Sequence, residues 1–231
     1  MVYIGDKTRE TPAMLLAGGR PVDAGVVGSI IKPALGRYIK PKVAYIGAAN
    51  GDRESFYDMI GPLLLEAGAA EMHFVRLARE NIDNNTTRAV LSDADVVFLS
   101  GGEVEDGINW IKKHGLAGLL KELYLAGKQF IGISAGAIML GDWWVRWDVP
   151  DDDDTAALFR CLGIVPAVFD THAEDEDWIE LKTVLRLLGD GSHGYGLRRG
   201  GIISADSRGT LVDLENKYMT FVYKNGLFEI Q

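Results

Sequence analysis

The stretch Phe130-Ile131-Gly132-Ile133-Ser134-Ala135-Gly136-Ala137-Ile138-Met139-Leu140 decides the fold of this chain. It begins as a short apolar strand and continues as a helix of small residues, with Ser134 at the junction and a glycine two positions to either side. This spacing is typical of a nucleophile elbow, a turn sharp enough to push the serine hydroxyl out of the sheet. The following helix directs its N-terminal amides at the site, where they favour developing negative charge. The pattern favours catalysis, although an ordinary glycine-rich turn has the same spacing.

Strands and helices alternate along the first 140 residues. The expected strands are 13–17, 42–49, 72–77 and 95–100, and the expected helices are 53–67, 81–92 and 105–126, the last broken at Gly115. This alternation predicts a largely parallel sheet covered by helices on both faces. The active site should lie beyond the carboxyl ends of the strands, where both Gly101-Gly102 and the elbow fall.

The C-terminal third has a different pattern. We expect a strand over 163–169, a helix over 173–188 with an acidic first turn, and a glycine-rich loop over 189–196. Short apolar runs at hairpin-like spacing follow, which predicts an antiparallel C-terminal extension of the same sheet domain. Residues 1–231 are therefore expected to form a single α/β hydrolytic domain.

Composition excludes several classes of function. Of the 231 residues, 47% are hydrophobic and the net charge is −9, so nucleic acids and anionic membranes are poor candidate partners. The chain has one cysteine, Cys161, which excludes an intrachain disulfide and fits a reducing cytoplasm. The N-terminus lacks a signal segment, and no apolar run approaches the ~20 residues that span a bilayer. We expect a cytoplasmic protein without a membrane partner.

A serine hydroxyl is a weak nucleophile and needs a base. Of the four histidines, His172 directly follows a predicted strand, where active-site residues collect, and is the preferred base. His193 in the glycine-rich loop is the alternative. His73 in an apolar strand is interpreted as structural, and His114 beside two lysines as part of a solvated face.

The acid that would orient this base has more than one candidate. Asp148 lies between Ser134 and His172 in the sequence, and Asp170 lies two residues before the histidine. The oxyanion needs backbone N–H groups, and the amides of Ala135 and of the Gly101-Gly102 turn are the candidates.

With these residues, the chain resembles the peptidase E and cyanophycinase-like serine peptidases. The matching pieces are Leu99-Ser100-Gly101-Gly102, Gly132-Ile133-Ser134-Ala135-Gly136-Ala137, Trp147-Asp148-Val149-Pro150 and Asp170-Thr171-His172. The resemblance implies a class I glutamine-amidotransferase-like, flavodoxin-like fold, with serine replacing cysteine at the elbow. It also implies the catalytic and oxyanion-hole residues, which are Ser134 as nucleophile, His172 as base, Asp148 as orienting acid, and the amides of Gly102 and Ala135. Gly101, Glu103 and Thr171 flank these positions and are expected to contact the substrate, and no metal or cofactor is expected.

Two departures from the family pattern concern specificity and the orienting acid. Aspartate-specific relatives carry aromatic and arginine residues after the histidine, whereas this chain has Ala173-Glu174-Asp175-Glu176-Asp177-Trp178. A glycine-isoleucine-aspartate-glutamate element of relatives is replaced here by Gly196-Leu197-Arg198-Arg199-Gly200. The first departure predicts a weak preference for aspartate, and the second leaves Asp148 to orient the base.

The leading hypothesis is a serine peptidase that hydrolyses short peptides through an acyl-enzyme. An α/β-hydrolase esterase is disfavoured, because the three triad residues span only 134–172 and that fold usually inserts further strands between them. A non-catalytic binding module that retains the fold is the alternative from another class. The expected partner is a small peptide, and a homodimer is an open alternative.

Overall fold

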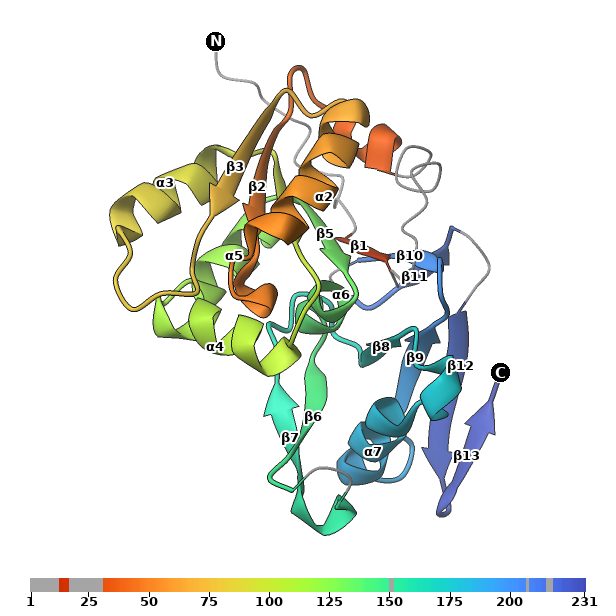
Figure 1. Ribbon diagram of the computed structural model, residues 1–231. Helices are drawn as coiled ribbons and strands as arrows, with labels where there is room; N and C mark the ends of the chain where they lie inside the picture. The colour runs from red at the N-terminus through yellow and green to blue at the C-terminus, as the bar shows by residue number, and fades with distance from the viewer. Residues whose placement is uncertain (1–12, 17–30, 150–151, 207, 215–217) are drawn as a thin grey trace.

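The computed structural model describes residues 13–16, 31–149, 152–206, 208–214 and 218–231 (Figure 1). Its largest sheet has seven strands in the order β11-β10-β1-β5-β4-β2-β3. These strands are β1 (Ala13–Leu16), β2 (Lys42–Ile46), β3 (Glu71–Val75), β4 (Val96–Leu99), β5 (Gln129–Ile133), β10 (Ile202–Ala205) and β11 (Leu211–Asp213). The five neighbouring strands β1, β5, β4, β2 and β3 pair in parallel. The strands β10 and β11 continue the sheet beyond β1 in antiparallel pairing.

Helices cover both faces of this sheet. Successive side chains of a strand point to opposite faces. In β2, Val43 and Tyr45 pack with residues 31–35 and α2, whereas Ala44 and Ile46 pack with the helices of the other face. These helices are α2 (Glu54–Glu66) on the first face and α3 (Asn84–Asp93), α4 (Val104–Lys113) and α5 (Ala117–Leu125) on the second. The expected parallel sheet between two helical layers is confirmed.

The C-terminal third adds a second sheet and a projecting hairpin (Figure 1). The second sheet has the order β13-β12-β9-β8, with α7 packed against it. The bounds are β6 (Trp143–Trp147) and β7 (Ala156–Arg160) for the hairpin, and β8 (Phe169–Thr171), β9 (His193–Leu197), β12 (Tyr218–Lys224), β13 (Leu227–Ile230) and α7 (Ile179–Leu188) for the second sheet and its helix. β12 pairs antiparallel with β13 and with β9, as expected for the C-terminal extension. β8 and β9, in contrast, pair in parallel. In the described part of the chain, no helix is long and apolar enough to cross a membrane.

Three local expectations differ from the structure. The strand over 163–169 is reduced to β8, which begins at Phe169. The helix over 173–188 is divided, because Asp177 and Trp178 have φ angles of 52° and 57° that an α-helix cannot contain. The acidic residues therefore form a separate 3-10 turn, Glu174–Glu176, before α7 begins. The loop over 189–196 ends earlier than expected, because β9 begins at His193.

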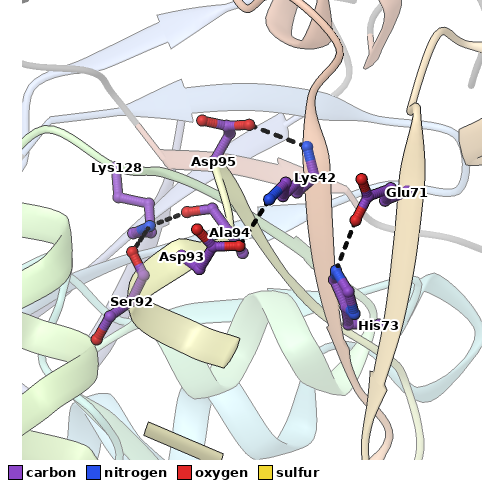
Figure 2. A network of polar contacts seen from close by, with 8 residues as sticks. All are labelled: Lys42, Glu71, His73, Ser92, Asp93, Ala94, Asp95 and Lys128. Carbon is purple, nitrogen blue, oxygen red and sulfur yellow. Dashed lines mark hydrogen bonds and ion pairs between the residues drawn. The ribbon is translucent and has the colours of Figure 1, made fainter. Parts of the chain in front are cut away.

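A polar network lies at the amino ends of strands of the parallel sheet (Figure 2). Lys42 at the start of β2 bonds Asp95 through its backbone N–H at 2.9 Å and Asp93 through Nζ at 2.8 Å. Lys128, before β5, donates to the carbonyls of Ser92 and Ala94, and burial lowers the pKa of this lysine. These bonds connect the starts of β2, β4 and β5 with one another.

Candidate active site

Ser134 occupies a sharp turn between β5 and the helix α6 (Ala135–Leu140). Its φ and ψ angles are 54° and −124°, a combination that non-glycine residues rarely adopt and that costs about 1–3 kcal/mol. Such strain persists where the surrounding structure holds it, and it is the geometry of a nucleophile elbow. The side chain is half-buried, so its hydroxyl is held at the protein surface rather than in the core.

The two elbow glycines are required by close backbone approach. A Cβ atom on Gly132 would overlap the carbonyl of Gly136, and one on Gly136 would overlap the carbonyl of Leu99 in β4. The strand, the turn and the helix therefore fit together only without these side chains, as the sequence predicted. Contact with β4 also brings the elbow against the neighbouring Gly101-Gly102 turn.

His172 meets the serine. It follows β8 directly, and its Nε2 atom lies 2.7 Å from the Oγ atom of Ser134. Its backbone has a φ angle of 48°, and its N–H donates to the carbonyl of Leu197 at 2.7 Å, which fixes the turn that presents the ring. This geometry allows the imidazole to accept the serine proton.

The other three histidines lie elsewhere. The Nε2 atom of His73 lies 3.3 Å from the carboxylate of Glu71 on β3. His114 was expected on a solvated face, but its side chain is buried. Its Nε2 atom lies 2.9 Å from the carbonyl oxygen of Leu77. His193 is exposed at the start of β9, and its ring packs edge-on against Tyr195.

Asp148 is not brought to the histidine. It follows β6 near the end of the β6–β7 hairpin, which projects away from the central sheet (Figure 1), and its side chain is 76% exposed. Its carboxylate lies 3.7 Å from Arg146, and the described residues contain no hydrogen bond between Asp148 and His172. The sequence order Ser134, Asp148, His172 was therefore misleading, because the intervening hairpin carries the aspartate away.

The Gly101-Gly102 turn lies directly beside Ser134. A Cβ atom on Gly101 would be 3.1 Å from the Cβ of Ser134, and Gly102 has a φ angle of 143°. Within the described residues, the backbone N–H groups of Gly102 and Ala135 have no hydrogen-bond acceptor. Two free N–H groups flanking a serine hydroxyl are the elements of an oxyanion hole.

The three residues expected to contact the substrate differ in exposure. Gly101 is buried against the serine, and Glu103 is exposed at the N-terminus of α4. Thr171 is buried, and its N–H donates to the carboxylate of Asp170 at 2.7 Å. Thr171 is the last residue of β8, directly before the histidine.

Asp170 is a buried carboxylate two residues before the histidine. Burial, with the nearby charge of Glu180, raises its pKa to about 7. Its Oδ2 atom makes no full hydrogen bond within the described part of the chain, although the nearby N–H of Leu181 offsets part of the burial penalty. Glu180 accepts a 2.6 Å hydrogen bond from the indole of Trp144, and burial raises its pKa also. Two poorly solvated carboxyl groups therefore lie close to each other, and one of them is two residues before His172.

The acidic turn after the histidine is largely neutralised by neighbours. Arg199 donates to Asp175 from its guanidinium at 2.6 Å and to Glu174 from its backbone N–H at 2.7 Å. Lys182 pairs with Asp177 at 2.7 Å. Of the two arginines at 198–199 that could receive a substrate carboxylate, Arg199 is therefore already paired within the protein, whereas Arg198 donates to the sulfur of Met219 at 3.1 Å.

Metal and thiol chemistry find no evident support in the described residues. They contain no group of three or more histidine, cysteine or acidic side chains that could hold a metal ion. Cys161 is buried, and burial raises the pKa of its thiol to about 12, so it is a core residue.

Sequence reasoning did not single out two groups that border the site. One is Asn50, whose side chain reaches the Gly101 carbonyl at 3.0 Å. The other is the pair of Trp144 and Glu180. No local pattern connects Asn50 with a turn 51 residues away, whereas the three tryptophans within residues 143–147 are a visible signal for the second.

The sequence and the fold of this chain both match known proteins. Residues 14–209 match the sequence model of peptidase family S51. A curated protein of Bacillus subtilis (strain 168), named as the uncharacterized peptidase YgaJ, is 23% identical over 137 residues. That match covers 59% of this chain and 56% of the relative, so the chain aligns with little more than half of the relative's length.

Two solved structures share the fold. The crystal structure of a peptidase from an acI-B1 actinobacterium superposes with a TM-score of 0.68 at 19% identity, covering 96% of this chain and 93% of that chain. A protein of Listeria monocytogenes EGD-e, provisionally named peptidase E, superposes with a TM-score of 0.62 at 17% identity, covering 89% and 99%. At these identities the likeness concerns the fold, and the chemistry has to be argued from the site.

Proposed function

Because the chain belongs to peptidase family S51, we propose that it is a serine peptidase that hydrolyses short peptides through an acyl-enzyme on Ser134. The family match and the named relatives confirm the resemblance to peptidase E-like proteins drawn from the motifs. The observation that carries the proposal is the 2.7 Å separation between the hydroxyl of Ser134 and Nε2 of His172, on a strained elbow beside two free N–H groups.

The proposed reaction has two halves. In the first, Oγ of Ser134 attacks the peptide carbonyl while His172 takes the hydroxyl proton, and the amides of Gly102 and Ala135 hold the developing oxyanion. The tetrahedral intermediate collapses, the C–N bond breaks, and His172 gives its proton to the leaving amine. In the second half, water attacks the acyl-enzyme with His172 again as base, which releases the acid product and restores the serine.

The proposed site functions as a dyad. In the described residues, no carboxylate is hydrogen-bonded to Nδ1 of His172, and Asp148 lies on the hairpin. The buried Asp170 lies two residues before His172, but its hydrogen bond is to the backbone of Thr171. The orientation of the imidazole is therefore ascribed to its Ser134 contact and to the constrained turn after β8.

We further propose weak or no preference for aspartate beside the cleaved bond. The support is that Arg199 is already paired with Asp175, and that the turn after His172 carries four acidic residues, Glu174, Asp175, Glu176 and Asp177. An additional carboxylate at about 4–6 Å from one of these groups would cost on the order of 1 kcal/mol or more, even with strong screening.

A hydrolysis screen over dipeptides and short peptides tests the proposal, with Ser134→Ala as the matched inactive control. We expect cleaved peptides in the wild-type reaction and none in the control. Peptides that differ only at the residue before the scissile bond then measure the aspartate preference. Equal turnover by both proteins would refute the serine mechanism, and strong aspartate selectivity that Arg199→Ala abolishes would refute the specificity proposal alone.

A non-catalytic binding module is the second candidate. The observation that favours it is the Nδ1 atom of His172, for which the described residues provide no acidic partner. This candidate predicts peptide binding without turnover. Calorimetry on the same peptide set distinguishes the two, because an enzyme would release products during the titration whereas a binding module would return the peptide unchanged.

A further inference from the structure

Asn50 is a buried side chain that connects two loops at the carboxyl edge of the sheet. It ends the 3-10 turn Ala48–Asn50 after β2 and is 7% exposed. Its Nδ2 donates to the Gly101 carbonyl at 3.0 Å and to Oγ of Ser100 at 3.0 Å. Its Oδ1 accepts from the N–H of Arg53 at 3.1 Å, so both ends of the amide are engaged.

The bond to Gly101 determines the direction of the next N–H group. A trans peptide is planar, so the carbonyl of Gly101 and the N–H of Gly102 point in opposite directions. With the carbonyl held against Asn50, the Gly102 N–H points away from Asn50. Gly101 lies against Ser134, and the described residues offer this N–H no acceptor. The N–H is thus presented unpaired at the edge of the site.

We propose that Asn50 is a positioning residue that locks the Gly101–Gly102 peptide with its N–H directed at the oxyanion. The inference rests on the proposed function, because it assigns Asn50 a role in the same acyl-transfer step. Asn50 does not touch the reacting atoms and acts through the backbone of the turn.

The turn needs such a lock because it consists of two glycines. Glycine adopts many backbone conformations, so a Gly-Gly peptide can rotate at little cost and turn its carbonyl toward the serine. A carbonyl oxygen in that position would repel the developing oxyanion instead of stabilising it. Two neighbouring bonds do not involve the Gly101–Gly102 peptide and leave it free to rotate: the Tyr45 hydroxyl donates to Oγ of Ser100 at 2.8 Å, and the backbone N–H of Glu103 donates to the carbonyl of Ala49 at 2.7 Å. Among the described residues, Asn50 is the side chain bonded to the Gly101 carbonyl itself.

The rate of reaction with a fluorophosphonate probe measures this role without a known substrate. Oγ of Ser134 forms a bond to phosphorus, fluoride leaves, His172 takes the serine proton, and the phosphoryl oxygen occupies the oxyanion position. Loss of one oxyanion donor typically slows acyl transfer about 10²–10³-fold. Because Asn50→Ala loosens the donor without removing it, we expect labelling to slow by about 10–100-fold.

Tyr45→Phe is the matched control. It removes a hydrogen bond from the same buried network but leaves the bond between Asn50 and Gly101 intact. We expect both variants to melt at a lower temperature, while Tyr45→Phe is labelled within about twofold of the wild-type rate. On a cleaved peptide, Asn50→Ala should lower kcat with KM nearly unchanged, because the lost stabilisation belongs to the transition state.

Asn50→Asp provides the second variant if Asn50→Ala does not fold. It keeps an acceptor for Arg53 while replacing the donor to Gly101 with an oxygen, so the slow labelling should persist. Labelling of a folded Asn50 variant at the wild-type rate, or equal slowing by Tyr45→Phe, would overturn the inference alone. A wild-type protein that the probe does not label would overturn the proposed function, and the inference with it.

Discussion

His172 Nε2 lies 2.7 Å from Ser134 Oγ, although 38 residues separate the two along the chain. Ser134 directly follows a strand of the central sheet, and His172 directly follows a strand of the second sheet. Their contact therefore depends on how the two sheets are joined. Both residues have positive φ angles, 54° and 48°. Strained backbone on both partners of one hydrogen bond indicates a site that the fold holds in place rather than a chance contact.

The first prediction concerns the coupling of these two residues. His172→Ala should reduce turnover by several orders of magnitude, about as much as Ser134→Ala, and the double variant should lose little more because the two act as a unit. His193→Ala is the matched control and should retain activity, since His193 is exposed and packs against Tyr195. An inactive His193→Ala with an active His172→Ala would reverse the assignment of the base.

The second prediction concerns Asp148. Removal of a true orienting acid lowers kcat about 10⁴-fold. Because the Asp148 side chain is 76% exposed and unconnected to His172 in the described residues, Asp148→Ala should change kcat/KM by about twofold or less. Steady-state kinetics on any cleaved peptide measure this. A loss of a thousandfold would mean that the hairpin closes onto the histidine during catalysis.

The third prediction concerns the dependence of stability on pH. The carboxyl of Asp170 has a folded-state pKa of about 7 against an ordinary value of 3.8. Between these values the folded protein keeps a proton that the unfolded chain loses, so the Asp170 contribution lowers the free energy of unfolding as pH rises from about 4 to 7. The cost is fully present above pH 7 and amounts to about 4 kcal/mol.

Asp170→Asn should remove this cost. The variant should gain stability relative to wild type as pH rises through this window, with little further change above pH 7. Denaturant unfolding at several pH values measures the difference, and Asp148→Asn controls for the loss of one charge at an exposed position. A difference between Asp170→Asn and wild type that stays constant from pH 4 to 8 would show that the Asp170 carboxyl ionises alike in both states.

The fourth prediction concerns the packing of the elbow. Gly136→Ala places a Cβ against the carbonyl of Leu99, and overpacking of this kind costs about 1–3 kcal/mol or more. Gly118→Ala is the opposite control, because Gly118 lies in α5 with nothing within 4 Å of the added atom. It should stabilise the protein by about 0.5–1 kcal/mol. Similar stability changes for the two variants would contradict the close approach of the elbow to β4.

The parallel half of the fold could be predicted because each strand is a continuous apolar run followed by small residues. The runs around Val43, Val97 and Phe130 are fully buried, so burial alone specifies them without reference to distant contacts. The elbow could be predicted because the glycine spacing around Ser134 is itself a local pattern, although the contact that requires Gly136 is with Leu99 in β4.

The rest of the site depends on contacts that no local pattern contains. Asp148 follows Ser134 at a plausible distance in sequence, yet the pairing of β6 with β7 directs it outward. The helix predicted after His172 is broken by the positive φ angles of Asp177 and Trp178, a packing effect that the acidic composition does not reveal. The role inferred for Asn50 depends on a hydrogen bond across 51 residues.

Intact-mass measurement after treatment with a fluorophosphonate tests the central claim, the nucleophilic serine, most directly. The account predicts one covalent adduct on the wild-type protein, located on the peptide that contains Ser134, and none on a folded Ser134→Ala variant. An unmodified wild-type protein, or an adduct that persists in Ser134→Ala, would contradict it.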